Sequence, residues 1–332
     1  MDAAGPFLVI PTKRGAVPIL TPAQVDAILL PVERLMATSV FDAMDFVKPC
    51  SAAQMSLSAF CGWSGYGTVL TLRSSFHGPH ASAASTDSAV AGDSEKGRSV
   101  VTFERWCEVV RATKPVLAVG MHESTPLCEP LNKRRRVAAT RSATWGDKTE
   151  ATTDLGCTVL PSISVDSAHD GGFVDAVPRG ENCYEFFQTL QSLQLSADKC
   201  SMCVVTSIPA LLAAMASNVR LMECPLPWTL AEKGVALVLP TGGAKASAPP
   251  LLDLNDNAFV LDISPIAEDC DCFTCRRHCR AYLHHLLTVQ EMNSDILLAM
   301  HNLTQVVQLV RAYRGADTSA REALVRTVAC AL

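Results

Sequence analysis

The chain has 332 residues, of which 48% are hydrophobic and 18% are charged, and its formal net charge at pH 7 is -5. This composition predicts a globular protein, and the negative balance means that nucleic-acid contact would need a local basic patch or a partner. No apolar run approaches the roughly 20 residues that span a bilayer, and Asp2 stands where a signal peptide would be basic. We therefore expect a cytoplasmic protein whose 14 cysteines are reduced.

Short β-type runs alternate with helical stretches as far as residue 263. The expected strands are Phe7–Pro11, Thr68–Leu72, Pro115–Met121, Cys157–Pro161, Gly172–Val177, Met202–Thr206, Arg220–Glu223, Val235–Leu239 and Phe259–Ile263. Helices are expected after Thr21-Pro22, where the threonine is a good N-cap, near Thr102, near Asn182 and from Ile208. So many alternations favour an α/β fold of the (β/α)8 barrel type over a short doubly wound sheet.

Two segments interrupt this alternation. Residues 74–96 are rich in Ser, Ala, Gly and His, which predicts a flexible surface loop without a site. The basic run Lys133-Arg134-Arg135-Arg136 opens a helix that holds Arg141 and Trp145. The run could contact phosphate or act as a nuclear import signal, but a solvated helix face is the simpler interpretation.

The chain becomes helical after residue 263. A long helix is predicted from a stripe of apolar residues at helical spacing, namely Ile296, Leu297, Met300, Leu303, Val306, Val307 and Val310. A last helix is expected from Ser319, with Glu322 completing a capping box. We expect two domains, a barrel over residues 1–263 and a metal-binding helical subdomain over residues 264–332, whose apolar stripe offers a surface to a partner.

The cysteines Cys270, Cys272 and Cys275 place three sulfurs within one turn of chain, which in a reduced protein indicates a metal site. Several residues nearby could complete it, namely Cys279, His278, His284 and His285. We favour His301, because a ligand on a distant helix gives the metal two segments to join. Four protein ligands leave no position for a reacting water, so the prediction is one structural Zn²⁺.

The C-terminal third closely resembles the tRNA-guanine transglycosylase, or queuine tRNA-ribosyltransferase, family. The matching segments are Cys270-x-Cys272-x2-Cys275, Arg280-Ala281-Tyr282-Leu283-His284-His285-Leu286 and His301-Asn302-Leu303. Weaker matches extend forward to Pro6-Phe7 through Thr12, Gly15, Leu20-Thr21, Arg141-x3-Trp145 and Gly171-Gly172-Phe173. The resemblance covers most of the chain and is strong over residues 219–303. It implies a (β/α)8 barrel with a zinc-binding insertion, acting in the exchange of guanine for queuine at the tRNA wobble position.

The residues that carry catalysis in the family are altered here. In catalytic members an aspartate in a Phe-Asp-Cys-Val-Leu-Pro-Thr-Arg-Asn-Ala-Arg-Asn-Gly-like stretch is the nucleophile, and the matching stretch is Met222 to Gly234. Glu223 stands at the nucleophile's position, one methylene longer, and a shift of about 1 Å can cost roughly a hundredfold in rate. Thr229 and Glu232 replace two arginines that would meet the tRNA backbone, and Glu232 would repel phosphate.

The second carboxylate expected of the family is missing too. Catalytic members carry an Asp-Ser-Gly-Gly-Phe-Gln motif for the general acid/base, and the chain has neither this string nor the early Asn-Thr-Tyr-His-Leu run. An intact zinc module with degraded catalytic strands resembles the non-catalytic subunits of the eukaryotic enzyme, which pair with a catalytic subunit through their zinc-bearing ends. The resemblance therefore implies a heterodimer that contacts tRNA as a complex, with no catalytic residue in this chain.

Two other functions stay open on the sequence. The chain could itself be an active transglycosylase with Glu223 as the nucleophile, or a zinc-dependent RNA-binding protein that uses Lys133 to Arg136. A nuclear location, or peripheral association with the mitochondrial outer membrane as in some eukaryotic members, is the alternative to the cytoplasm.

Overall fold

The computed structural model describes residues 5–76, 85–94, 96–124, 133–152, 154–163, 171–175, 183–240 and 250–331. The chain forms two compact units, which are described separately. Unit 1 comprises residues 1–17 and 32–224, and unit 2 comprises residues 18–31 and 225–332. The separation into domains at residues 263 and 264 stays a prediction.

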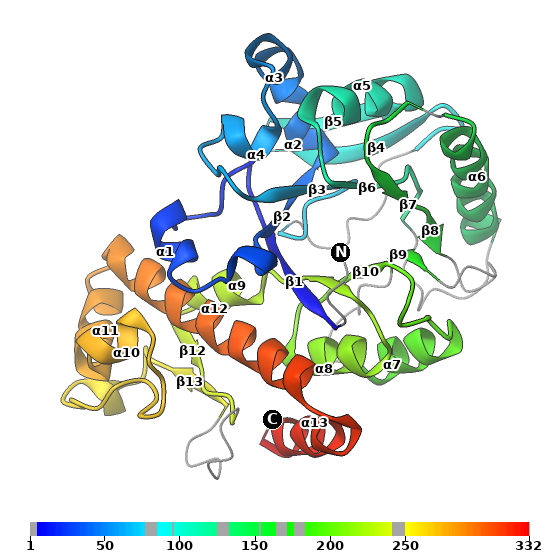
Figure 1. The fold of residues 1–332 in the computed structure, drawn as a ribbon. Coiled ribbons are helices and arrows are strands. Elements are labelled where there is room, and N and C mark those ends of the chain that lie inside the picture. The colour runs from blue at the N-terminus through cyan, green and yellow to red at the C-terminus, as the bar shows by residue number, and fades with distance from the viewer. Residues whose placement is uncertain are drawn as a thin grey trace. The chain divides into compact units, whose positions relative to one another are not determined.

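Unit 1 is a parallel barrel. Its strands are β1 (Phe7–Pro11), β2 (Leu35–Ser39), β3 (Gly67–Thr71), β6 (Leu117–Val119), β7 (Thr158–Leu160), β8 (Ser162–Ile163), β9 (Gly172–Val174), β10 (Ser201–Val204) and β11 (Leu221–Glu223). They form one sheet in the order β7-β6-β3-β2-β1-β11-β10-β9-β8, with every pair parallel (Figure 1). Since only Pro161 separates β7 from β8, the two ends of this order are one bent strand, and the sheet is nearly closed as expected.

Helices lie outside the strands of unit 1 (Figure 1). They are α2 (Val40–Ala43), α3 (Val47–Ala53), α4 (Leu57–Phe60), α5 (Phe103–Thr113), α6 (Lys133–Glu150), α7 (Cys183–Ser192) and α8 (Ile208–Ala216), with a 3₁₀ turn at Met44–Phe46. The N-cap of α5 is Thr102, whose hydroxyl accepts from the Arg105 amide, as the sequence predicts.

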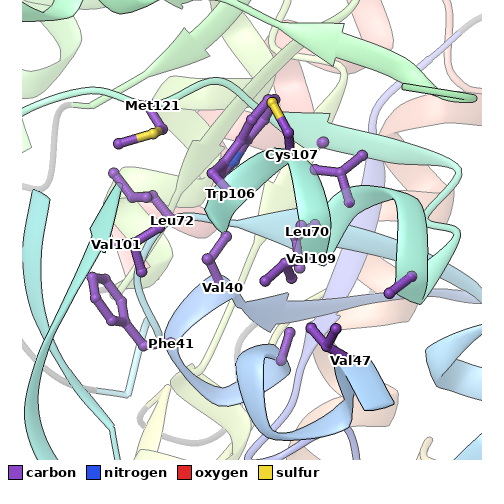
Figure 2. Packing of buried hydrophobic residues seen from close by; sticks show 14 of the residues in the cluster. Val40, Phe41, Val47, Leu70, Leu72, Val101, Trp106, Cys107, Val109 and Met121 are labelled. Carbon is purple, nitrogen blue, oxygen red and sulfur yellow. The ribbon is translucent and has the colours of Figure 1, made fainter. Parts of the chain in front are cut away.

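Two apolar layers stabilise unit 1. Alternate residues of the strands fill the barrel interior, for example Phe7 and Val9 on β1. The outer layer packs strand residues such as Leu70 against α2, α3 and α5, and Figure 2 shows Val40, Trp106 and Val109 within it. This alternation fixes which residues beyond each strand point into the mouth of the barrel.

Unit 2 is mainly helical. It contains α1 (Pro22–Asp26), α9 (Leu226–Ala231), α10 (Phe273–Arg277), α11 (Arg280–Thr288), α12 (Met292–Gly315) and α13 (Thr318–Ala331), a 3₁₀ turn at Asn257–Phe259, and the antiparallel pair β12 (Val235–Leu237) and β13 (Leu251–Asp253). The Thr21 capping box of α1 is present, as expected. Hydrogen bonds from Arg311 to the Ile28 carbonyl and from Trp228 to the Pro18 carbonyl tie α1 and its flanks into this unit.

Several sequence expectations about individual elements are wrong. The strand Leu35–Ser39 was not expected, because Leu, Met and Ala carry little β-propensity, yet it is wholly buried. Val235–Leu237 pairs with β13 instead of joining the barrel, and residues 259–263 are not a strand. The loop expected over residues 74–96 contains strand β4 (Ala89–Ser94), paired with β5 (Gly97–Thr102), although residues 77–84 and 95 lie outside the described residues.

Two expectations about the C-terminal helices also need correction. The last helix begins at Thr318, and its cap is the Asp317 carboxylate, which accepts from the Ala320 amide at 2.8 Å. The apolar stripe of α12 is not a free surface. Its members Leu297, Met300, Leu303, Val306, Val307 and Val310 are buried in unit 2, where α12 packs on α9 and α10.

The junction at Pro161 allows a test of barrel closure. Gly172, on β9, has φ +148°, and an added Cβ would lie 2.4 Å from the Pro161 carbonyl oxygen. Gly172→Ala should therefore lower the free energy of unfolding by roughly 3 kcal/mol in urea titrations. Gly146→Ala in α6, where a Cβ meets nothing within 4 Å, should instead raise it by about 1 kcal/mol. An unchanged stability for Gly172→Ala would contradict the closure described here.

Candidate metal centre and barrel mouth

The cysteine cluster is shaped by the start of α10. Cys272 is the N-cap of this helix, and its Sγ accepts from the Cys275 amide at 3.3 Å. The Thr274 hydroxyl donates to the Leu297 carbonyl at 2.7 Å and fixes α10 against α12. Because α12 also carries His301, the hydrogen bond between Thr274 and Leu297 brings the sulfurs at the start of α10 close to the His301 imidazole.

The three sulfurs surround one nitrogen of His301. Nδ1 lies 3.8 Å from the Sγ of Cys270, 3.5 Å from that of Cys272 and 3.3 Å from that of Cys275. The four ligand atoms all lie within 4.8 Å of one another, and the His301 side chain is fully buried. This Cys3His cluster could hold a metal ion.

The other candidate ligands near the cysteines are placed elsewhere. His284 Nδ1 makes a 2.8 Å hydrogen bond with the Leu254 carbonyl, and His278 stacks on Tyr282. Cys279 is the N-cap residue of α11 and is not among the four grouped ligands.

The second nitrogen of His301 fixes the orientation of its ring. Nε2 lies 2.6 Å from the Leu237 carbonyl oxygen on β12, so Nε2 carries a proton and donates, and Nδ1 is the nitrogen that faces the sulfurs. Asn302 Oδ1 accepts from the Leu237 amide, and Gln305 Oε1 accepts from the Leu239 amide. Sequence reasoning missed the role of these two buried amides, although polar residues inside an apolar helical stripe are the signal that could have revealed it.

The cluster attracts protons and cations. Burial lowers the pKa of His301, but hydrogen bonds and charge from Cys270 and Cys272 outweigh it and raise this pKa to about 9. Hydrogen bonds from Cys272 and Cys275 lower the pKa of Cys270, so one sulfur is readily held as thiolate. The Cys270 thiolate thus lies beside the protonated imidazole of His301. A bound metal ion would take the place of the imidazole proton as the positive charge among the sulfurs.

The second candidate site is the mouth of the barrel in unit 1. Leu221 points into the interior, so Glu223, two residues later on β11, points inward at the carboxyl end of the strands. By the same alternation Arg73 follows Val69, and Asp175 follows Phe173. Active sites of this fold lie at that end.

Glu223 is enclosed at the mouth. It is 2% exposed, and its Oε2 has no hydrogen-bond partner in the described part of the chain. Burial raises its pKa from 4.5 to about 7, an effect that hydrogen bonds from Ser75 partly oppose. The carboxyl group is therefore about half protonated near neutral pH.

Other titratable groups at the carboxyl ends of the strands lie close to a partner. His122 Nδ1 donates to the Gly120 carbonyl at 2.9 Å, and its Nε2 lies 3.7 Å from Asp175 Oδ2, while burial lowers the pKa of the imidazole. Arg141, which the resemblance singled out on α6, pairs with Glu123 at 2.9 Å. Sequence reasoning missed His122, Glu123 and Asp175, because only the barrel brings these separate strand ends together.

Thr229 and Glu232, the positions of the two family arginines, lie at the end of α9. The Thr229 hydroxyl donates to the Leu226 carbonyl, and Glu232 is exposed at the C-cap. In the basic run, Lys133 and Arg136 are exposed on the first turn of α6.

The fold and these sites define an α/β protein with a nearly closed parallel barrel and a Cys3His cluster that could bind a metal ion. A family profile described as Queuine tRNA-ribosyltransferase matches residues 3–317. The chain therefore belongs to the queuine tRNA-ribosyltransferase family.

Individual relatives fall into two groups. "Queuine tRNA-ribosyltransferase accessory subunit 2" of Drosophila pseudoobscura pseudoobscura is 24% identical over 96% of this chain and 83% of the relative. The protein of the same name in Schizosaccharomyces pombe is 27% identical over 92% and 74%. "Queuine tRNA-ribosyltransferase" of Thermus thermophilus is 40% identical, but over 33% of this chain and 26% of the relative. Similarity along most of the chain is thus found with accessory subunits.

Among the described residues, no helix combines the length and apolarity that crossing a membrane requires.

The cluster predicts which residues are needed for metal. In protein incubated with Zn²⁺ and dialysed, the original chain should retain about one equivalent by plasma mass spectrometry, and Cys272→Ser and His301→Ala should each retain close to none. The melting temperature should fall by roughly 10 °C, because three unpaired ligands remain buried. Cys279→Ser, outside the cluster, is the matched control and should leave the bound metal and the melting temperature unchanged. Loss of metal in this control would contradict the assignment of His301 as the fourth ligand.

The buried carboxyl group predicts a pH dependence of stability. A folded-state pKa of about 7 against 4.5 means that the folded state holds its proton while the unfolded state releases it, so stability falls as pH rises from 4.5 to 7. Glu223→Gln, which mimics the protonated form, should raise the free energy of unfolding at pH 8 by at most about 3 kcal/mol and change little at pH 4.5. The exposed Glu232→Gln should have no such effect. A destabilised Glu223→Gln protein at pH 8 would show that the carboxylate is charge-paired.

Proposed function

We propose that the chain is a non-catalytic subunit of a heterodimeric queuine tRNA-ribosyltransferase. A catalytic subunit exchanges guanine for queuine at the tRNA wobble position, and this chain supports that partner. The observation that carries the proposal is the burial of Glu223 at the family's nucleophile position in a chain whose Cys3His cluster is intact.

We propose that the cluster holds one structural Zn²⁺ through Cys270, Cys272, Cys275 and His301. Zinc bonds of about 2.3 Å to sulfur and 2.0–2.1 Å to nitrogen in a tetrahedron place sulfur and nitrogen about 3.6 Å apart. The three distances of 3.3–3.8 Å bracket that value. A full set of protein ligands and a hydrogen-bonded imidazole are typical of a structural zinc site, which would supply rigidity and no chemistry.

The state of Glu223 speaks against nucleophilic catalysis. A carboxylate that attacks the ribose must be ionised and must reach the substrate. Glu223 is buried, about half protonated near neutral pH, and one methylene longer than the family's aspartate. These properties support a chain that has lost the first step of base exchange.

The surface charge at the altered α9 positions supports the same proposal. Glu232 is exposed where the family has an arginine, so it would repel a tRNA phosphate instead of attracting it. Thr229 binds its own helix backbone and offers no charge. We propose that tRNA is bound by the complex, mainly through the partner, in the cytoplasm.

One observation favours a second candidate. Glu223 does point into the mouth of the barrel, and its Oε2 lacks a hydrogen-bond partner among the described residues, as a reactive group could. If the chain were an active transglycosylase, the purified protein alone would incorporate labelled guanine into tRNA.

Reconstitution tests the proposal. The purified chain should show no exchange of labelled guanine into tRNA, and adding the catalytic subunit from the same organism should give exchange with a 1:1 complex on a sizing column. The complex with Glu223→Gln should keep its rate within about threefold, because the residue is not used in the chemistry. Exchange by the chain alone, abolished by Glu223→Gln, would establish the second candidate instead.

A further inference from the structure

A pocket opens on unit 2 between three helices. Its volume is about 560 Å³, and its walls come from α1, the start of α10 and the middle of α12. Volumes of roughly 300–1,000 Å³ are typical of sites that hold a small molecule. Cys272 contributes to one wall, but none of the other lining residues belongs to the Cys3His cluster. The pocket is therefore a separate site that the proposed function does not use.

The interior of the pocket is mostly apolar. Met300 and Val307 are buried residues of α12 and form its floor, while Ile28 and the Phe273 ring contribute to the sides. Ala27 lines the pocket from an exposed position on α1, and its small side chain leaves the space open. These walls favour a ligand with an apolar body, which would leave water when it binds.

The walls are already fixed relative to one another. Arg311 Nη2 on α12 donates to the Ile28 carbonyl at 2.8 Å, which ties the end of α1 to α12. The Thr274 hydroxyl ties α10 to the same helix at 2.7 Å. A pocket with such walls needs little ordering when a ligand enters.

The polar groups of the pocket are mainly hydrogen-bond donors. The guanidinium groups of Arg276 and Arg311 line it against a single carboxylate, Asp271, so the lining carries net positive charge. In the part of the chain that the structure describes, the side chains of Arg276 and Gln308 have no ion-pair or hydrogen-bond partner. Gln24 uses its carbonyl oxygen to cap α1, which leaves its NH₂ group as a donor. A group that accepts hydrogen bonds and carries negative charge complements this lining.

We propose that this pocket binds a small amphipathic anion. Its apolar body would pack on Ile28, Met300 and Val307, and its carboxylate, sulfonate or phosphate group would accept hydrogen bonds from Arg276. Three turns of a peptide helix, about 10 Å wide and 16 Å long, would need roughly twice the volume of the pocket, so a small molecule fits it better. The inference does not rest on the proposed function, because every lining residue belongs to unit 2 of this chain.

Two fluorescent dyes test the apolar and the anionic part separately. Anilinonaphthalene sulfonate carries one sulfonate, and N-phenylnaphthylamine has the same rings without it. Titrated into the full-length chain, both dyes should bind saturably at one site, and the sulfonate dye should bind more tightly. Ala27→Trp fills the pocket from an exposed position, so it should weaken both dyes about tenfold or more without lowering the melting temperature.

A pair of neighbouring arginines tests the anionic part. Arg276→Gln should weaken the sulfonate dye about fivefold, because it removes a charge-assisted hydrogen bond, and should leave the neutral dye within about twofold. Arg277→Gln removes the same charge from an exposed position outside the lining and is the matched control. This control should bind both dyes like the original chain.

Three results would overturn the inference. Unchanged dye binding in Ala27→Trp would place the dyes outside the pocket. Equal weakening by Arg276→Gln and Arg277→Gln would show a general effect of surface charge instead of a bound anion. Release of the dye when purified catalytic subunit is added would show that a protein covers the pocket. The proposed function would stand after each of these results, because guanine exchange is measured independently.

Discussion

The imidazole of His301 is the contact on which unit 2 depends. Its Nε2 donates to the Leu237 carbonyl of β12, and its Nδ1 faces three cysteine sulfurs. One side chain therefore connects the small sheet, the long helix α12 and the cysteine segment. Because the sulfurs are close and one of them is readily held as thiolate, a cation among them would be favourable.

Rigidity spreads from this contact to the surface. The Thr274 hydroxyl holds α10 to α12. The ion pair between Asp262 and Arg280 holds the turn at residues 261–264 to α11. A metal ion that fixes α10 would thus preserve the arrangement of Phe273 beside His278.

Unit 1 follows a different constraint. The barrel requires that alternate residues of its strands fill the interior, with β7 and β8 together acting as one of eight strands. This packing persists whatever chemistry occurs at the mouth. The groups at the mouth have become partners for one another, as in Arg141 with Glu123, while Glu223 is enclosed and readily protonated. The packing of the barrel therefore does not depend on whether position 223 carries the family's aspartate or the glutamate found here.

The sequence was sufficient to predict the elements that short-range patterns determine. Hydrophobic alternation gave most barrel strands, the Thr21 box gave the start of α1, and cysteine spacing indicated the cluster. Features set by tertiary contacts were not predictable. Burial made Leu35–Ser39 a strand despite its weak propensity, and backbone bonds to α11 turned the apolar residues near Ile263 outward instead of into a strand. The mouth residues His122 and Asp175 needed the closed sheet to bring them together.

The central claim is that this chain supplies structure and its partner supplies chemistry. The most direct measurement is guanine exchange by a complex in which the catalytic subunit has lost its nucleophilic aspartate while this chain is unchanged. The claim predicts an intact 1:1 complex with no detectable exchange into tRNA. Exchange that persists in this complex and disappears with Glu223→Gln would contradict it.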